Sequence, residues 1–368
     1  MDKAKSRIML KGKIKWLLWL FFSVCSVTIT ILWWMVIEFH RDYQNIPPDH
    51  LIGNKPSHVE KLEEKGFPFS FLVLGDASGT ETAESLIEMA MRNGTPSFLI
   101  LLGDFVTNPD IWNHRFFLTE MTTEIRPPFP VFLVAGNHDI DYTSSKKISD
   151  DRRVTPEVFE SLYGAMNFDF IFNNCLFIIC GVDLKNPVGF LNYLRETLSK
   201  KGGGKSYVFV FIHYPPKGLA EHIKGSLPIP NEEDFFSLLE TYKVTTCFFG
   251  DYHGYWRGQR KGVNLIVSGG GGGRLKQSQP EWGKFHQILR VSVDNDIIIE
   301  DVITLPDRLI NFEDVFEKRV FTKFFPIVQN RNWILYGIFF LLLSLGIYSF
   351  AFFYISLRKK KLDEHKKS

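Results

Sequence analysis

The sequence carries little net charge and few cysteines. Its 43 basic and 41 acidic side chains leave a formal charge of +2 over 368 residues, so its overall charge gives no reason to expect nucleic acid as a partner. Of the four cysteines, Cys25 lies in a long apolar stretch, and the three that remain are an odd count that does not describe a disulfide framework. Cys175 and Cys180 stand five residues apart in a strand-like run, which places their side chains on opposite faces. We expect these two cysteines and Cys247 to be small buried hydrophobic residues.

Charge is absent altogether from two long stretches, residues 16–37 and 333–357. Each exceeds the roughly 20 apolar residues that a helix needs to cross a bilayer. Basic residues crowd the flanking ends, 1–15 and 358–368, and the positive-inside rule then places both termini in the cytoplasm. The segment between the stretches is expected on the other side, in the periplasm, the cell exterior or an organelle lumen.

Each apolar stretch has an alternative interpretation. A cleaved signal peptide would explain the first, but that stretch is long and ends in WWMVIEFH without a small-residue cleavage pattern. A buried core helix would explain the second, but its length and the RKKK that follows favour a membrane anchor. We therefore expect two membrane-spanning helices around one large domain.

The chain divides on this basis into seven segments. The expected boundaries are a basic cytoplasmic tail (1–15), a transmembrane helix (16–37), a linker (38–66), a large folded domain (67–305), a juxtamembrane connector (306–332), a second transmembrane helix (333–357) and a second basic tail (358–368).

Within the central domain, strand-like runs alternate with helical stretches. Apolar runs at 69–74, 98–102 and 131–135 have strand character, whereas 82–94 and 189–200 show helical spacing. Such alternation predicts an α/β domain in which helices cover the sheets.

Polar residues of metal-ligand type follow five of the expected strands. They are Asp76, Asp104, Asn137, His213, and Asp251 with His253. In open α/β sheets functional groups gather beyond the carboxyl ends of the strands. A single Gly-Asp after a strand is also a common turn, but five such strand ends in order point to a shared site.

The ordered series GDASG, GDF, GNHD, HYP and GDYHG resembles the calcineurin-like metallophosphoesterase superfamily, with purple-acid-phosphatase-like members as the most similar branch. The resemblance covers roughly residues 67–303. It implies a four-layer α/β/β/α sandwich, here flanked by two transmembrane helices, that holds two metal ions at the strand tips. It also implies in-line attack on a phosphate mono- or diester by a metal-activated hydroxide.

When the motifs of the family are matched to this sequence, the resemblance implies that Asp104 is the ligand shared by both ions. Asp76 and His253 would serve the first ion, and the second would be held by Asn137, His213 and Asp251. His138 would act on the substrate, and Asp139 would orient His138.

Three positions depart from the family pattern. The first motif has Ser78 where a histidine is usual, and the fifth has Asp251 where a histidine is usual. Thr107 stands where purple acid phosphatases have a tyrosine ligand. The presence of Ser78 is explained equally well by a role as a metal ligand and by a helix-capping Ser or Thr at this strand-to-helix turn. An oxygen-rich site favours manganese or iron, with zinc as the alternative.

Other polar residues carry weaker signals. His222 follows HYPP and Arg274 follows SGGGGG, so both are candidates to contact an anionic substrate. The glycine run lacks the lysine of a P-loop, and we expect it to let the backbone pass close to the metal ions. His114 and His286 lie outside the motifs and are expected at the surface.

The sequence therefore predicts a membrane-anchored phosphoesterase acting outside the cytoplasm on a phosphorylated small molecule or a lipid or glycolipid headgroup. The alternative is a catalytically degenerate relative that binds metal or a phosphorylated ligand without turnover. A transporter is disfavoured because two spans around a large domain offer no polar path through a membrane.

Overall fold

The computed structural model describes residues 2–64, 66–142, 148–220, 227–276, 283–305, 307–328 and 332–365. The chain forms two compact units. The larger unit is Asn45–Phe316, and the smaller unit combines Met1–Gln44 with Glu317–Ser368.

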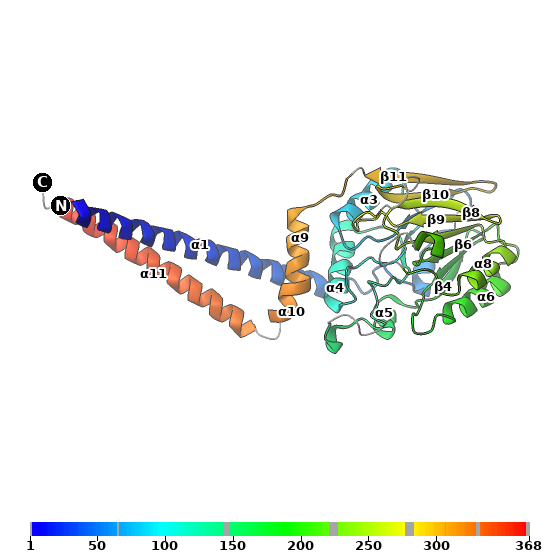
Figure 1. Ribbon diagram of the computed structural model, residues 1–368, viewed down its shortest axis with the longest axis horizontal. Coiled ribbons are helices and arrows are strands. Elements are labelled where there is room, and N and C mark those ends of the chain that lie inside the picture. Colours follow the sequence, from blue (N-terminus) through cyan, green and yellow to red (C-terminus); the bar gives the residue numbers. More distant parts are fainter. Residues whose placement is uncertain are drawn as a thin grey trace. The chain divides into compact units, whose positions relative to one another are not determined.

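The larger unit contains two β-sheets (Figure 1). The first sheet has the order β11(Ile298–Leu305), β10(His286–Val293), β1(Phe69–Leu74), β2(Leu99–Leu101), β3(Val131–Leu133). The second has the order β4(Phe168–Phe172), β5(Cys175–Cys180), β6(Tyr207–Ile212), β7(Thr246–Phe249), β9(Val263–Ser268), β8(Tyr255–Arg260). Strands β1 to β3 run parallel, as do β5, β6, β7 and β9. In the first sheet β10 runs antiparallel to both of its neighbours, β1 and β11, and in the second the antiparallel strands β4 and β8 form the edges.

Aromatic rings fill the space between the two sheets. Phe71 on β1 stacks on Phe98 at 5.2 Å between ring centroids and meets Phe177 of β5 edge-on at 5.4 Å. Phe211 and Phe248 stack at 5.0 Å on neighbouring strands of the second sheet. All five side chains are fully buried. Aromatic contacts of this kind add roughly 0.5–1.5 kcal/mol each beyond the burial of area, so this layer holds the two sheets at a fixed separation.

Helices cover the outer faces of both sheets. Helices α3(Glu81–Arg92), α4(Ile111–Glu120) and α5(Pro156–Tyr163) pack on the first sheet, and α6(Gly189–Lys201) and α8(Glu232–Thr241) on the second. Because both faces of the central strands are buried, these strands are apolar at almost every position rather than alternating. The predicted four-layer α/β/β/α sandwich is confirmed.

Seven further helical segments of the described residues are short. They are α2(Pro56–Val59), η1(Met121–Ile125), η2(Asp150–Arg152), α7(Lys217–Ala220), α9(Phe312–Arg319), η3(Val320–Phe324) and α10(Phe325–Val328).

The cysteines of the larger unit are buried and free of disulfides, as predicted. Cys180 packs with the helices on the outer face of the second sheet, whereas Cys175 packs between the sheets, so the two thiols point to opposite faces. Burial raises the pKa of the Cys175 thiol to about 12, which leaves it protonated and unreactive near neutral pH.

The smaller unit contains a pair of long antiparallel helices, α1(Asp2–Gln44) and α11(Asn332–His365), which lie side by side (Figure 1). Trp33 meets Tyr336 at 4.8 Å between ring centroids, and Trp19 meets Phe350 at 6.2 Å, which fixes the antiparallel register. Each helix contains a candidate membrane span, Trp16–Gln44 and Tyr336–Ile355, with a mean hydropathy of 2.2.

Most apolar side chains of these spans are exposed or half-buried. Only 6% and 0% of the two apolar windows are buried, and Trp34 and Ile355 are both 63% exposed. A helix in a soluble core buries such side chains, so the core-helix interpretation of the second stretch does not fit this structure. Two candidate membrane-spanning helices remain, as the sequence predicted.

Candidate metal centre

Three aspartates turn sharply out of the strand ends. Asp76, Asp104 and Asp251 each follow a glycine that ends a buried strand, and each has a left-handed backbone with φ of 56°, 50° and 56°. Aspartate adopts the left-handed backbone region more readily than most residues, but this conformation is still uncommon for any residue other than glycine. Three such turns at one edge of the two sheets bend the carboxylates toward a common point, and backbone outliers of this kind cluster at functional sites.

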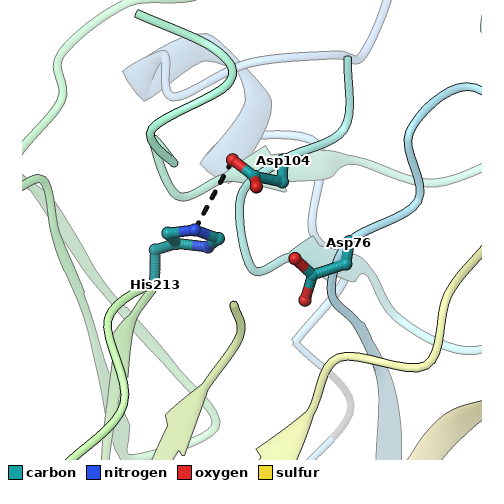
Figure 2. A group of neighbouring side chains, drawn as sticks. All are labelled: Asp76, Asp104 and His213. Carbon is teal, nitrogen blue, oxygen red and sulfur yellow. Dashed lines mark ion pairs between the residues drawn. The ribbon is translucent and has the colours of Figure 1, made fainter. Parts of the chain in front are cut away.

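Asp76, Asp104 and His213 lie together at this edge and form the centre of the candidate site (Figure 2). One ligand atom of each lies within 4.8 Å of the others, and all three residues are buried. The Nε2 atom of His213 is 3.5 Å from Oδ1 of Asp104. These residues come from β1, β2 and β6, so both sheets contribute to one site.

Three further predicted ligands lie around this centre. Oδ1 of Asn137 is 3.2 Å from Nε2 of His213, and Oδ1 of Asp251 is 4.0 Å from the same nitrogen. Nε2 of His253 is 3.4 Å from Oδ1 of Asp76. The structure thus brings together all six residues that were predicted as metal ligands.

The histidine rings are held in the orientation that metal ligands need. Nδ1 of His213 is 2.7 Å from the Leu102 carbonyl, and Nδ1 of His253 is 2.8 Å from the Arg274 carbonyl. A carbonyl only accepts hydrogen bonds, so each Nδ1 carries a hydrogen and each Nε2 is the ring nitrogen that faces the carboxylates. Metal-binding histidines typically donate their second N–H in this way, which fixes the tautomer and the ring.

The environment of Asp76 fits a cation. Its side chain is 0% exposed, and neither carboxylate oxygen has a hydrogen-bond partner in the described part of the chain; its ionic contact is to His253. Leaving a charged group unsatisfied in the interior is costly. Burial raises the pKa of Asp76, and His253 opposes this only in part. A cation held by Asp76 would remove the penalty.

Glycines provide the room beside these ligands. A Cβ on Gly136 would lie 2.4 Å from Oδ1 of Asp104, and one on Gly269 would lie 2.6 Å from Oδ2 of Asp76. Both distances are shorter than real Cβ contacts allow. The expectation that the glycine run after β9 passes close to the site is therefore confirmed for Gly269.

The carboxylates also change the titration of His213. Burial alone would lower the pKa of this imidazole, but the charges of Asp104, Asp76 and Asp251 raise it to about 9. The metal-free site therefore holds a proton on His213 near neutral pH, where a bound cation would displace it.

His138 lies at the open side of the site. Its side chain is 45% exposed, and Nε2 is 3.9 Å from Oδ2 of Asp104. Nδ1 is 2.8 Å from the Thr107 carbonyl and therefore carries the hydrogen. The backbone N–H of His138 donates to Oδ1 of Asp104 at 2.8 Å, which ties this loop to the shared ligand.

The expected role of Asp139 as the group that orients His138 is wrong. Its carboxylate instead accepts from the backbone N–H groups of Asp104 (2.8 Å), Gly136 (2.8 Å) and Val106 (3.2 Å). The tight turn of GNHD points this side chain back under the loop, so the carbonyl of Thr107 orients the His138 ring. Asp139 is a structural link between the two ligand loops.

The weaker candidates have different outcomes. The backbone N–H of Ser78 donates to the Asp104 carbonyl at 2.9 Å, and helix α3 is preceded by Thr80, whose side chain does not cap it. The backbone carbonyl of Arg274 supports His253, while its side chain is exposed. His222 lies outside the described residues. Direct roles for Ser78 and Arg274 stay predictions.

Two histidines that were expected at the surface are buried. His114 is 0% exposed and His286 is 2% exposed, so this expectation is wrong. Nδ1 of His286 lies 2.9 Å from the Gly270 carbonyl, within the glycine run. His114 contacts the GNHD loop, with Nε2 2.9 Å from the carbonyl of Asp139. The burial of these two histidines could not be predicted from the neighbouring residues, because their hydrogen-bond partners are distant in the chain.

Comparison with known proteins agrees with this geometry. The family model for calcineurin-like phosphoesterases matches residues 69–255, a span that contains all six predicted ligands. A purple acid phosphatase from yellow lupin has a similar fold, with a TM-score of 0.53 and 15% identity over 68% of this chain. The match covers 55% of the lupin protein, so this chain spans about half of that length.

A second similar structure is GAP50 of Plasmodium, described as the anchor in the inner membrane complex. Its TM-score is 0.46 and its identity 13%, over 69% of this chain and 95% of that protein. No curated protein sequence matches the chain.

Proposed function

The chain belongs to the calcineurin-like phosphoesterase family, and on this premise we propose that it is a metal-dependent hydrolase of phosphate mono- or diesters. The observation that carries the proposal is the buried group Asp76, Asp104 and His213, where both oxygens of Asp76 have no hydrogen-bond partner in the described chain. A site that served only to form turns would not leave a carboxylate in this state.

We assign the six predicted ligands to two sets that share Asp104. His253 contacts Asp76, whereas Asn137 and Asp251 lie next to His213. Two bound ions, with manganese or iron favoured by the oxygen-rich donors, would neutralise phosphoryl charge and acidify water. Asp104 would hold both ions, and the fixed histidine tautomers would keep both Nε2 lone pairs available.

His138 is placed to handle a proton. Because Nδ1 donates to the Thr107 carbonyl, Nε2 is the atom that gains or loses the proton. Its exposure leaves it accessible to a substrate, so a protonated His138 would donate from Nε2 to the leaving oxygen of the ester. Asp139 would support this step indirectly, by fixing the backbone of the two ligand loops.

We predict that the purified full-length chain hydrolyses an aryl phosphate ester when Mn²⁺ is supplied. The expected result is metal-dependent release of the phenol that is lost in EDTA and restored by added Mn²⁺. Parallel assays with an aryl monoester and the corresponding diester identify the preferred class. Full Mn²⁺ binding without turnover of either ester would contradict the proposal and favour the catalytically degenerate alternative.

We further propose that both candidate spans anchor the chain in a membrane, with the termini in the cytoplasm and the larger unit outside it. The uncharged stretches 16–37 and 333–357 and their basic flanks support this topology. A domain tethered at both ends suits a phosphorylated lipid or glycolipid headgroup in the same membrane.

The topology predicts which parts of the chain a protease can reach. In sealed vesicles that expose the cytoplasmic face, tags at both termini should be cleaved while the larger unit is protected until detergent is added. Phosphate release from a lipid phosphomonoester in the same vesicles tests the substrate class. Cleavage of the larger unit without detergent would contradict the topology.

A further inference from the structure

A buried histidine supports the GNHD loop from behind. His114, on helix α4, makes two hydrogen bonds, one through each ring nitrogen. Nε2 is 2.9 Å from the Asp139 carbonyl, and Nδ1 is 3.0 Å from the hydroxyl of Tyr163 on helix α5. Both His114 and Tyr163 are 0% exposed, so water cannot replace either bond.

The two partners determine where the hydrogens lie. The Asp139 carbonyl only accepts, so Nε2 of His114 is the donor, and Nδ1 accepts from the Tyr163 hydroxyl. Burial lowers the pKa of His114 to about 3, so the ring is neutral under ordinary conditions and keeps this single tautomer. The Tyr163 hydroxyl thus selects the tautomer that can hold Asp139.

Asp139 passes this restraint on to the ligands. Its carbonyl is held by His114, and its carboxylate accepts from the backbone N–H of Asp104 and of Gly136. Asp104 in turn accepts from the N–H of His138. The peptide that His114 fixes therefore lies at the junction of the loop that carries Asp104 and the loop that carries His138.

Ring packing reinforces the same connection. Phe105, directly after Asp104, meets His114 edge-on at 5.8 Å and Tyr163 edge-on at 5.6 Å. Phe105 is itself 0% exposed. A shift of the His114 ring would move this side chain and the neighbouring ligand loop together.

We propose that His114, with its tautomer set by Tyr163, is a positioning residue that holds the Asp104 and Asn137–His138 loops in the geometry required for metal binding. The inference rests on the proposed metal centre but does not depend on turnover. A merely structural His114 would contribute to folding without a specific effect on metal affinity.

Two substitutions of similar size separate these roles. His114→Gln keeps an N–H donor near the position of Nε2 and an oxygen that can accept from Tyr163, whereas His114→Leu fills the space without either. Loss of a group that orients metal ligands typically costs roughly 10- to 100-fold in metal affinity. We expect His114→Leu to weaken Mn²⁺ binding at least about tenfold and His114→Gln to remain within about threefold of the original chain.

Binding is measured on the full-length chain by the decrease of the free Mn²⁺ electron paramagnetic resonance signal, and melting in EDTA reports the fold separately. The proposal is supported if the Leu and Gln variants melt alike in EDTA but differ in Mn²⁺ affinity. Equal affinities, or affinity losses that follow the loss of metal-free stability in both variants, would overturn it.

The same measurement separates this inference from the proposed function. If the original chain binds Mn²⁺ but hydrolyses no ester, the proposed activity fails while the affinity comparison still decides the role of His114. If the original chain binds no Mn²⁺, both proposals fail.

Discussion

Replacing Asp104 by Asn is expected to abolish hydrolysis of aryl phosphates while leaving the chain folded. Nε2 of His213 is 3.5 Å from Oδ1 of Asp104, and the ligand atoms of Asp104 and Asp76 lie within 4.8 Å of each other. The substitution removes a negative charge that two cations would share, and metal ions contribute several kcal/mol to such reactions. Since each 1.4 kcal/mol corresponds to tenfold in rate, we expect a loss of about a thousandfold or more in kcat/KM.

The fold should tolerate this change because an amide oxygen can still accept from the N–H of His138, as Asp104 does at 2.8 Å. Asp296→Asn, at an exposed turn between β10 and β11, is the matched control and should retain activity. If the activity of Asp104→Asn stayed within about tenfold of that of the original chain, the proposed catalytic role of this carboxylate would be contradicted.

Gly269→Ala should damage both the fold and the metal centre. A Cβ at this position would lie 2.1 Å from the Tyr252 carbonyl oxygen and 2.6 Å from Oδ2 of Asp76. The first contact is with backbone, which cannot rotate away, so the strand end or the Asp76 loop must shift. Forcing extra atoms into a packed interior typically costs roughly 1–3 kcal/mol, and a displaced Asp76 should weaken Mn²⁺ binding by about tenfold or more.

Thermal melting in EDTA and Mn²⁺ titration measure the two effects. Gly203→Ala is the control, because a Cβ there meets no atom within 4 Å, and it should match the original chain in both measurements. If Gly269→Ala also matched the original chain, the close approach of this loop to Asp76 would not be a feature of the folded protein.

Much of the fold and of the site could be predicted because the relevant signals are local. Buried strands are apolar at nearly every position, and the turn residues that follow them, such as Gly75-Asp76 and Gly103-Asp104, are adjacent in sequence. Parallel strands bring such ends to one edge regardless of their separation in the chain. The α/β class and the expectation of a shared site follow from these two facts, whereas the four-layer architecture and the roles of the six ligands came from the resemblance to the family.

The features that sequence reasoning missed depend on side-chain direction and on distant partners. Asp139 stands next to His138 in the chain, yet the turn directs its carboxylate to the N–H groups of Asp104 and Gly136. His114 is separated by 25 residues from Asp139 and by 49 from Tyr163, so no local pattern marks it. Such contacts become visible only when the helices are in place on the sheet.

The number of Mn²⁺ ions bound by the full-length chain tests the central claim most directly. Equilibrium dialysis of the original chain and of Asp104→Asn gives this number without relying on any substrate. We predict about two ions per chain for the original protein and at most one for the variant, because Asp104 is the ligand that both ions would share. Binding of less than one ion by the original chain, or equal binding by both proteins, would contradict the account.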